Sequence, residues 1–381
     1  MDFTRLDAFL DRLTAWRIPG NDCVIMKDGK VIYRHLSGFA DIEEGRRMNG
    51  SETYNMWSCS KPITCAAALT LVESGDILIT DPVSNYLPEY KDVKVKRENA
   101  DGTFELVAPQ REITVRDLFA MTSGYTYSTD CEAVAEVKKA SGGKCPTREM
   151  VRAFAKIPLA AEPSTHWIYG ISHDILAGLV EEVSGEKFRD YVRRVIFEPL
   201  EMNDSCYGVP SERLLSRMAR QYSFDDEKNI AIPSNNSNFY VFGEDYDSGG
   251  AGLVSTVDDY IKFAYAMANG GVGVNGRRIL SPSTIELMRQ NALNEDEMRD
   301  ITVGQYRGYG YGLGVRTMVN RSVGGSIGPV GEFGWAGAAG AWVMIDPDNR
   351  LAAFYCMHML NNQEMYTVNR LKNVIYSCIE A

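Results

Sequence analysis

Two hairpin signals, one near each end of the 381-residue chain, most constrain how it can fold. The segment CVIMKDGKVIY (23–33) alternates apolar and polar residues around Asp28-Gly29, a pair favoured in two-residue hairpin turns. The segment 341–356 contains two apolar runs separated by the turn-forming residues 346–349. We therefore expect an antiparallel sheet whose strands come from both ends of the chain.

The stretch between these hairpins carries mostly helical patterns. Apolar side chains recur at helical spacing, between Gly and Pro clusters, in residues 114–121, 147–155 and 173–184. Amphipathic helices are also predicted close to each terminus, at 3–13 and 363–379. The Gly/Tyr-rich run GYGYGLGVRT (308–317) is interpreted as a single strand.

This order of elements predicts an α/β (α+β) protein. Its antiparallel sheet would be flanked by N- and C-terminal helices and interrupted by an inserted, mostly helical domain. We place the sheet domain at 1–77 and 226–381 and the insert at 78–225. The joints of an insert create a cleft, so we expect the active site between the two domains.

Charge and composition exclude several partners. The chain has 40 Lys plus Arg against 51 Asp plus Glu, and its net charge of -11 repels nucleic acid and anionic lipid. No apolar run reaches about 18 residues and the first helix is amphipathic, which favours a cytoplasmic protein with no membrane span. The cysteines form no C-x-x-C pair and the histidines no H-E-x-x-H motif, so neither a metal nor another cofactor is predicted.

The decapeptide MWSCSKPITC (56–65) contains the strongest candidate for chemistry. Ser58 and Lys61 are three residues apart and share one face if a helix begins near Ser58, whereas Cys59 turns away. Free backbone N–H groups at a helix N-terminus stabilise an oxyanion. A dehydrated, neutral lysine could accept the serine proton. The pair alone also fits a capping serine and a surface lysine.

The surroundings of this pair are similar to those of a known family. Five stretches carry the resemblance: WSCSKPITCAAALTLVESGDILITDPVSNYLPEY, ITVRDLFAMTSG, HWIYGISHDILAGLVEEVSGEKFRDYVRRVIFEPLEMNDS, SGGAGLVSTVDDYIKFAYAMANGG and GWAGAAGAWVMIDPDN. In this order, from about residue 20 to 360, they resemble the serine beta-lactamase-related hydrolases. That group includes class C beta-lactamases, D-Ala-D-Ala carboxypeptidases and esterases. The resemblance implies a beta-lactamase/transpeptidase-like fold.

The resemblance also implies catalytic roles. Ser58 would be the acylated nucleophile and Lys61 its proton acceptor. Tyr169 would exchange protons with Lys61, and it would need a lowered pKa to act as a base. The backbone N–H groups of Ser58 and Ala338 would form the oxyanion hole.

Two departures from the beta-lactamase pattern affect the substrate. Ile171 stands where beta-lactamases have an asparagine, and Trp335-Ala336-Gly337 replaces their Lys-Thr-Gly. These changes remove a hydrogen-bonding amide and the cation that binds a lactam carboxylate, and they add apolar area. They resemble the esterase and acyltransferase branch. We expect these four residues and Tyr125 to line the substrate site.

A rival nucleophile is Ser326, in a G-x-S-x-G motif that is followed in chain order by Asp346 or Asp348 and then His358. The motif requires a helix directly after the serine, and Pro329 prevents one. A glycine loop is the favoured interpretation. Two histidines near Tyr169 are the remaining candidates, interpreted as a loop residue and a structural hydrogen-bonding group: His166 and His173.

The predicted function is a serine hydrolase that forms an acyl-enzyme on Ser58, most simply a carboxylesterase or acyl transferase acting on small esters. The first alternative is a beta-lactamase or D-amino-acid peptidase, acting on an amide. The second is a binding module that keeps the pocket without turnover.

Overall fold

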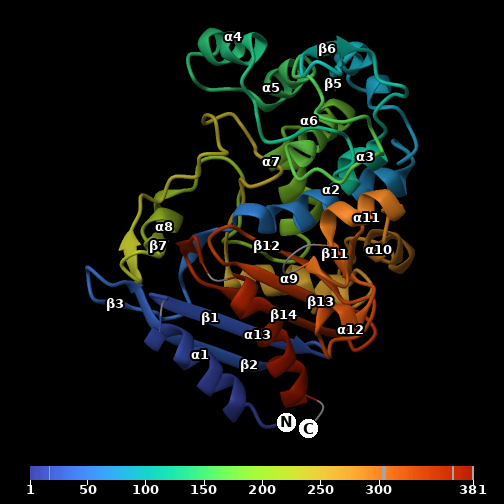
Figure 1. Ribbon diagram of the computed structural model, residues 1–381. Coiled ribbons are helices and arrows are strands. Elements are labelled where there is room, and N and C mark those ends of the chain that lie inside the picture. Colours follow the sequence, from blue (N-terminus) through green and yellow to red (C-terminus); the bar gives the residue numbers. More distant parts are fainter. Residues whose placement is uncertain (17, 303–305, 363, 380–381) are drawn as a thin grey trace.

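The computed structural model describes residues 1–16, 18–302, 306–362 and 364–379 (Figure 1). Within these residues its central feature is an eight-stranded sheet in the order β10-β11-β12-β13-β14-β1-β2-β3. All neighbouring strands in it are antiparallel. Their bounds are Tyr309–Tyr311 (β10), Arg316–Met318 (β11), Phe333–Ala336 (β12), Trp342–Asp346 (β13), Leu351–Cys356 (β14), Gly20–Lys27 (β1), Lys30–Asp41 (β2) and Arg46–Arg47 (β3).

The two predicted hairpins are neighbours in this sheet. β1 and β2 are joined at Asp28 and Gly29, whose φ angles of 49° and 78° are the left-handed values of a type I′ turn. β13 and β14 form the second hairpin, and β14 pairs with β1 so that Cys23 lies opposite Tyr355. The prediction of an antiparallel sheet built from both chain ends is confirmed.

Helices cover both faces of the sheet, and alternate residues of β1 face opposite layers. Cys23 and Ile25 pack in one layer with the two terminal helices, which lie side by side in Figure 1. Val24 packs in the other layer, where α9 lies against β14 and β1. The bounds of these helices are Thr4–Trp16 (α1), Glu364–Ile379 (α13) and Val257–Ala268 (α9).

The middle of the chain is mostly helical, and most of it lies together in the upper part of Figure 1. Its elements are η2 (Val83–Asn85), η3 (Pro88–Asp92), β5 (Val95–Glu98), β6 (Phe104–Val107), α3 (Val115–Ala120), α4 (Glu132–Ala140), α5 (Thr147–Phe154), α6 (Ser172–Ser184), α7 (Phe188–Val192), the π-helix η4 (Arg193–Phe197) and α8 (Glu212–Leu215). The division into a sheet domain and an insert at 78–225 stays a prediction. At its C-terminal limit, β7 (Tyr222–Asp225) pairs with β15 (Met359–Leu360) from the other end of the chain.

The segment 308–317 forms two strands, β10 and β11, so the prediction of a single strand is wrong. The chain turns between them, and Gly314 adopts a left-handed φ of 84°. A Cβ on Gly314 would lie 2.2 Å from Cys65 Sγ, so this tight turn requires glycine. The other elements are β4 (Thr53–Asn55), β8 (Ile230–Pro233), β9 (Val254–Thr256), α10 (Pro282–Arg289), α11 (Glu295–Ile301) and α12 (Arg321–Gly324). Among the described residues, no helix combines the length and apolarity needed to cross a bilayer.

Candidate active site

Ser58 lies in a tight turn that leads into a buried helix. The 3₁₀ turn η1 (Trp57–Cys59) runs directly into α2 (Ser60–Ser74), so the α-helix begins two residues later than the sequence predicts. Trp57 has a φ of 49°, a left-handed conformation that costs about 1 kcal/mol in residues other than glycine. Ser58 is partly exposed, whereas its two chain neighbours are buried. The turn therefore leaves one hydroxyl-bearing residue accessible at the end of the helix.

Lys61 is fully buried, and its side-chain nitrogen contacts three oxygens. Nζ donates to Ser58 Oγ at 3.1 Å, to the Tyr127 hydroxyl at 3.0 Å and to the carbonyl oxygen of Gly250 at 2.8 Å. Burial lowers the pKa of Lys61 to about 8, and the Asp174 carboxylate opposes this shift. A lysine with this pKa is substantially neutral near pH 8, and the neutral amine has a lone pair that can accept the Ser58 proton.

The carboxylate that acts on Lys61 is itself held in the core. Asp174, near the start of α6, accepts hydrogen bonds from the Tyr246 hydroxyl at 3.0 Å and the Ser248 hydroxyl at 2.7 Å. A Cβ at Gly250 would lie 2.6 Å from Asp174 Oδ2 and 3.5 Å from Lys61 Nζ. Glycine at this position therefore lets the lysine, the carboxylate and the backbone carbonyl lie close together.

Tyr169 reaches the same place from the segment before α6. Its ring centroid lies 4.6 Å from Lys61 Nζ, and its hydroxyl hydrogen-bonds the Ser58 side chain and accepts from Trp335 Nε1 at 2.9 Å. Burial raises the pKa of Tyr169 well above its ordinary value, which is opposite to the lowering expected from the sequence. In the free enzyme this phenol stays protonated, so it can donate a proton but is not poised as a base.

Tyr127, and not Tyr125, contacts Lys61. Tyr125 is completely buried, and its ring packs edge-on against Tyr90 at 6.2 Å, so the expectation that it lines the site is wrong. The chain turns at Gly124, where φ is 88°, and then passes through an irregular segment. No periodicity in such a segment indicates which of two nearby tyrosines faces the site.

β12 runs beside the serine turn. A Cβ on Gly337 would lie 2.3 Å from the Met56 carbonyl oxygen and 3.4 Å from Trp57 Cβ, so glycine is needed for this approach. Ala338 follows at an exposed turn, and its N–H donates to no other residue within the described chain. The N–H groups of Ser58 and Ala338 remain the predicted oxyanion hole.

Three of the predicted substrate-binding side chains lie in different surroundings: Trp335, Ala336 and Ile171. Trp335 is 1% exposed and packs in an aromatic cluster with Tyr169. Ala336, the next residue of the strand, belongs to the layer on the opposite face, so its side chain does not line the site. Ile171 is buried in the core at the start of α6, where it has no polar atom to offer a substrate.

A comparison of the sequence with protein-family models gives a match to the family described as Beta-lactamase, over residues 6–374. The chain belongs to the beta-lactamase family. Membership confirms the resemblance seen in the sequence and agrees with the mixed fold of antiparallel sheet and helices. It also makes the chain a relative of serine hydrolases, among which esterases and acyltransferases are represented.

Several proteins are similar over most of this chain. Esterase EstB of Burkholderia gladioli is 28% identical over 368 residues, covering 90% of this chain and 86% of the esterase. Protein Rv1367c of Mycobacterium tuberculosis is 27% identical over 346 residues, covering 89% and 85%. Among solved structures, EstCE1, a hydrolase with promiscuous acyltransferase activity, matches with a TM-score of 0.78 at 23% identity, covering 99% of this chain and 98% of its own. Unliganded simvastatin synthase (LovD) of Aspergillus terreus matches with a TM-score of 0.80 at 20% identity, with the same coverage.

The structure does not bring the rival serine, Ser326, together with Asp346 or His358: no hydrogen bond joins these groups within the described residues. Ser326 follows the short helix α12, and its hydroxyl accepts a hydrogen bond from the Gly328 N–H at 3.1 Å. Asp346 accepts from the Tyr376 hydroxyl at 2.8 Å, and the His358 Nδ1–H donates to the Ala219 carbonyl at 2.7 Å. The three groups are thus bound to other partners, as the glycine-loop interpretation predicts.

The remaining candidates have structural contacts. His173 is buried, burial lowers its pKa to about 3, and its Nε2–H donates to the Phe119 carbonyl at 3.1 Å. His166 is exposed and lies 3.0 Å from the Asp300 carboxylate. Cys59 is buried one residue after the serine. In the part of the chain that the structure describes, no three His, Cys, Asp or Glu side chains are grouped so that they could hold a metal ion.

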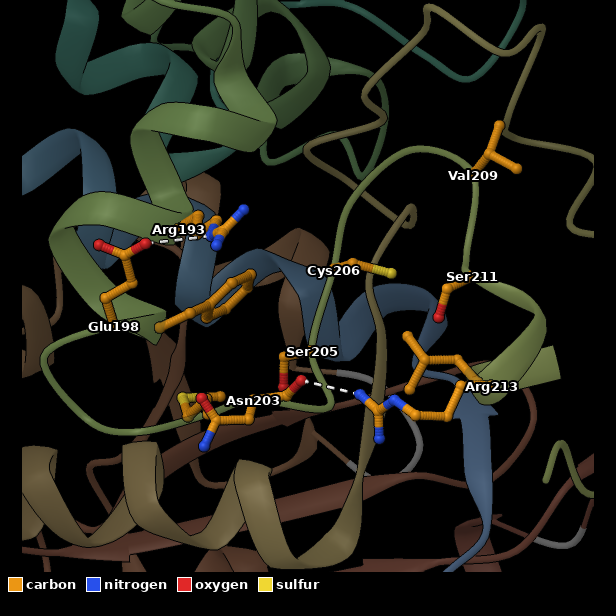
Figure 2. A pocket seen from close by; sticks show the side chains of 11 residues that line it. Arg193, Glu198, Asn203, Ser205, Cys206, Val209, Ser211 and Arg213 are labelled. Atoms are coloured by element: carbon orange, nitrogen blue, oxygen red, sulfur yellow. Dashed lines mark hydrogen bonds and ion pairs between the residues drawn. The ribbon is translucent and has the colours of Figure 1, made fainter. Parts of the chain in front are cut away.

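A cavity of about 360 Å³, which Ser58 does not line, lies between η4 and the loop before α8 (Figure 2). Its two arginines are already paired. Arg193 lies 3.1 Å from Glu198, and Arg213 donates to the Asn203 carbonyl at 3.2 Å. The cavity therefore offers neutral polar atoms and no free cation of its own to a charged ligand.

Proposed function

We propose that this beta-lactamase-family chain is a serine esterase and acyltransferase that works through an acyl-enzyme on Ser58. The observation that carries the proposal is the environment of Lys61. Its nitrogen lies 3.1 Å from Ser58 Oγ, and burial lowers its pKa to about 8. A solvent-exposed lysine would hold its proton near neutral pH, whereas this one can take up the serine proton.

In the acylation step, neutral Lys61 accepts the Ser58 proton while Oγ attacks the ester carbonyl carbon. The carbonyl oxygen becomes an oxyanion, which the N–H groups of Ser58 and Ala338 would stabilise. As the tetrahedral intermediate collapses, the ester C–O bond breaks and the Tyr169 hydroxyl donates its proton to the departing alkoxide. Lys61 then returns its proton to Tyr169, which restores both groups.

Deacylation reverses these transfers. Tyr169 passes its proton to neutral Lys61 while a water or a second alcohol gives its own proton to the Tyr169 oxygen and attacks the acyl carbon. The bond between the acyl carbon and Ser58 Oγ then breaks, and Oγ leaves with the proton from Lys61. Water as the acceptor gives hydrolysis, and an alcohol gives acyl transfer. Two aromatic groups around Tyr169, Trp335 and Tyr127, limit the water near the acyl carbon and so favour an alcohol acceptor held by apolar contact.

Labelling and kinetics test the proposal together. A fluorophosphonate is expected to add once per chain, as measured by intact mass, and peptide mapping is expected to find the adduct on Ser58. Ser58→Ala is expected to abolish hydrolysis of p-nitrophenyl butyrate, and Ser326→Ala is expected to retain most of it. Labelling of Ser326, or full activity of Ser58→Ala, would place the nucleophile elsewhere.

Two alternatives are separated from this proposal by one further assay. A beta-lactamase or D-amino-acid peptidase would turn over nitrocefin or a D-Ala-D-Ala peptide at a rate comparable to the ester. Trp335 and Ile171 argue against that activity, because neither offers a cation or an amide to such a substrate. A silent binding module would hydrolyse neither substrate and would not be labelled.

A further inference from the structure

An exposed phenylalanine rests on aromatic rings beside the proposed nucleophile. Phe239 is 63% exposed although it packs against two rings, Trp57 at 4.9 Å and Tyr240 at 4.6 Å. It belongs to residues 234–242, which follow β8 and which we call the aromatic loop. Tyr240 packs at 4.7 Å against Tyr127, whose hydroxyl accepts a hydrogen bond from Lys61, so the platform is connected to the proposed catalytic groups. An exposed ring supported by other rings offers apolar area at little cost in side-chain entropy.

The aromatic loop is held by hydrogen bonds from asparagine side chains. Asn238 Nδ2 donates to the Ala251 carbonyl at 2.7 Å, and Asn55 Nδ2 donates to the Asn236 carbonyl at 2.8 Å. Asn236 Oδ1 in turn accepts from the Gln221 N–H at 2.7 Å. These bonds tie the loop to Asn55, just before the serine turn, and to Ala251, next to the Gly250 carbonyl that Lys61 bonds. The platform is therefore largely formed before any substrate arrives.

The rings around the site form one continuous series, joined where Tyr127 packs at 5.6 Å against Tyr169. Trp167 and Trp335 flank Tyr169, with centroid distances of 5.8 Å and 5.4 Å. Tyr169 is the proposed proton donor, so the leaving alcohol belongs on its side. Tyr240 instead packs at 4.7 Å against Tyr127 and connects the site to the aromatic loop. The ester carbonyl carbon carries the leaving alcohol on one side and the acyl chain on the other. Because the alcohol is assigned to the Tyr169 side, we assign the acyl chain to the aromatic loop.

The charges around the platform disfavour an acyl chain that carries a negative charge. Within the described residues, no Lys or Arg lies over the rings of Trp57, Phe239 or Tyr240, and Lys61 is bonded to its three oxygens. Burial, and after it the negative charge of Asp174, raises the pKa of Tyr240. An acyl chain ending in a carboxylate would meet this negative field with no cation to pair with.

We propose that Phe239 and Tyr240, supported by the buried ring of Trp57, form the acyl subsite of the enzyme and select neutral, apolar acyl chains of medium length. The proposal rests on the esterase function proposed above and specifies its substrate class. Phe239 is connected to the site through Tyr240 and Tyr127, so we expect longer acyl chains or aryl-acyl groups, and not an acetyl group, to contact it. Each methylene that reaches an apolar subsite strengthens transition-state binding.

The test compares two ester series on the full-length protein. The first varies the acyl chain from acetate to decanoate at constant p-nitrophenol, and the second varies the alcohol from ethyl to octyl at constant acetate. For the wild type, kcat/KM is expected to rise with acyl length. Phe239→Ala is expected to lower the octanoate-to-acetate ratio of kcat/KM about tenfold or more. Phe239→Leu is expected to recover part of the ratio.

A matched control is Phe104→Ala, since Phe104 is also exposed, at 54%, but lies on the β5–β6 hairpin. It is expected to leave both series unchanged, and thermal melting checks the folding of every variant. An unchanged octanoate-to-acetate ratio in Phe239→Ala would overturn the subsite. A loss confined to the alcohol series would overturn its assignment to the acyl chain. Neither result would contradict the esterase function, which fails only if the wild type hydrolyses no ester or if Ser58→Ala retains full activity.

Discussion

The pH dependence of catalysis is the sharpest consequence of the buried lysine. Acylation needs neutral Lys61, and burial lowers its pKa to about 8. Below that pH the neutral fraction falls tenfold per unit, so kcat/KM at pH 6 is expected to be about one hundredth of its plateau. Above pH 8 the profile is expected to level off. Burial raises the pKa of Tyr169 and Tyr127, so no alkaline decline is expected below pH 10.

The measurement is kcat/KM for p-nitrophenyl butyrate from pH 5 to 10, followed by pH-stat so that ionisation of the product does not distort the rate. Asp174→Asn removes a charge that favours the ammonium form of Lys61, so it is expected to move the acidic limb to lower pH. A rise centred near pH 6.5 would indicate a histidine base. A rise near pH 10.5, the ordinary lysine value, would mean that the amine is not desolvated.

Three further substitutions test individual contacts. Tyr169→Phe removes the proposed proton donor, and it is expected to lower kcat about 10²- to 10⁴-fold with little change in KM, as measured by steady-state kinetics. Gly337→Ala places a methyl group 2.3 Å from the Met56 carbonyl oxygen, so urea denaturation is expected to show a loss of about 1–3 kcal/mol, together with reduced activity. Lys372→Met removes one of the two cations beside the buried Glu332 carboxylate, which keeps only Arg316, at 3.5 Å, as an ion partner. It is expected to cost about 3–5 kcal/mol, part of which a double variant with Glu332→Gln recovers. An unchanged kcat in Tyr169→Phe would contradict the proton-donor role, and an unchanged stability in Gly337→Ala would contradict the close approach of β12. Equal losses in Lys372→Met and its double variant would contradict the charge-pair argument.

A buried network of charged side chains around Glu332 supports the strand that carries Trp335. Glu332 immediately precedes β12, and it is 0% exposed between Arg316 of β11 and Lys372 of α13. These contacts join the strand that carries Trp335 to the neighbouring strand and to the C-terminal helix. Disturbing them is therefore expected to affect the position of the indole that bonds Tyr169 as well as global stability.

The sequence by itself determined the features that depend on local periodicity. A spacing of three residues places Ser58 and Lys61 on one side of a helical turn once a helix forms there, and Asp28-Gly29 favours a hairpin turn through local backbone geometry. The family motifs added Tyr169 because their order along the chain is preserved. These signals were enough for the fold class and for the core of the candidate site.

Only the tertiary structure decided which distant groups surround the lysine. Tyr127 is 66 residues from Lys61 in the sequence and Gly250 is 189, and both contacts arise from irregular segments that carry no period. The same packing buries Tyr125, lowers the pKa of the lysine and raises that of Tyr169. Desolvation depends on every neighbour that excludes water, so no local pattern in a sequence can encode it.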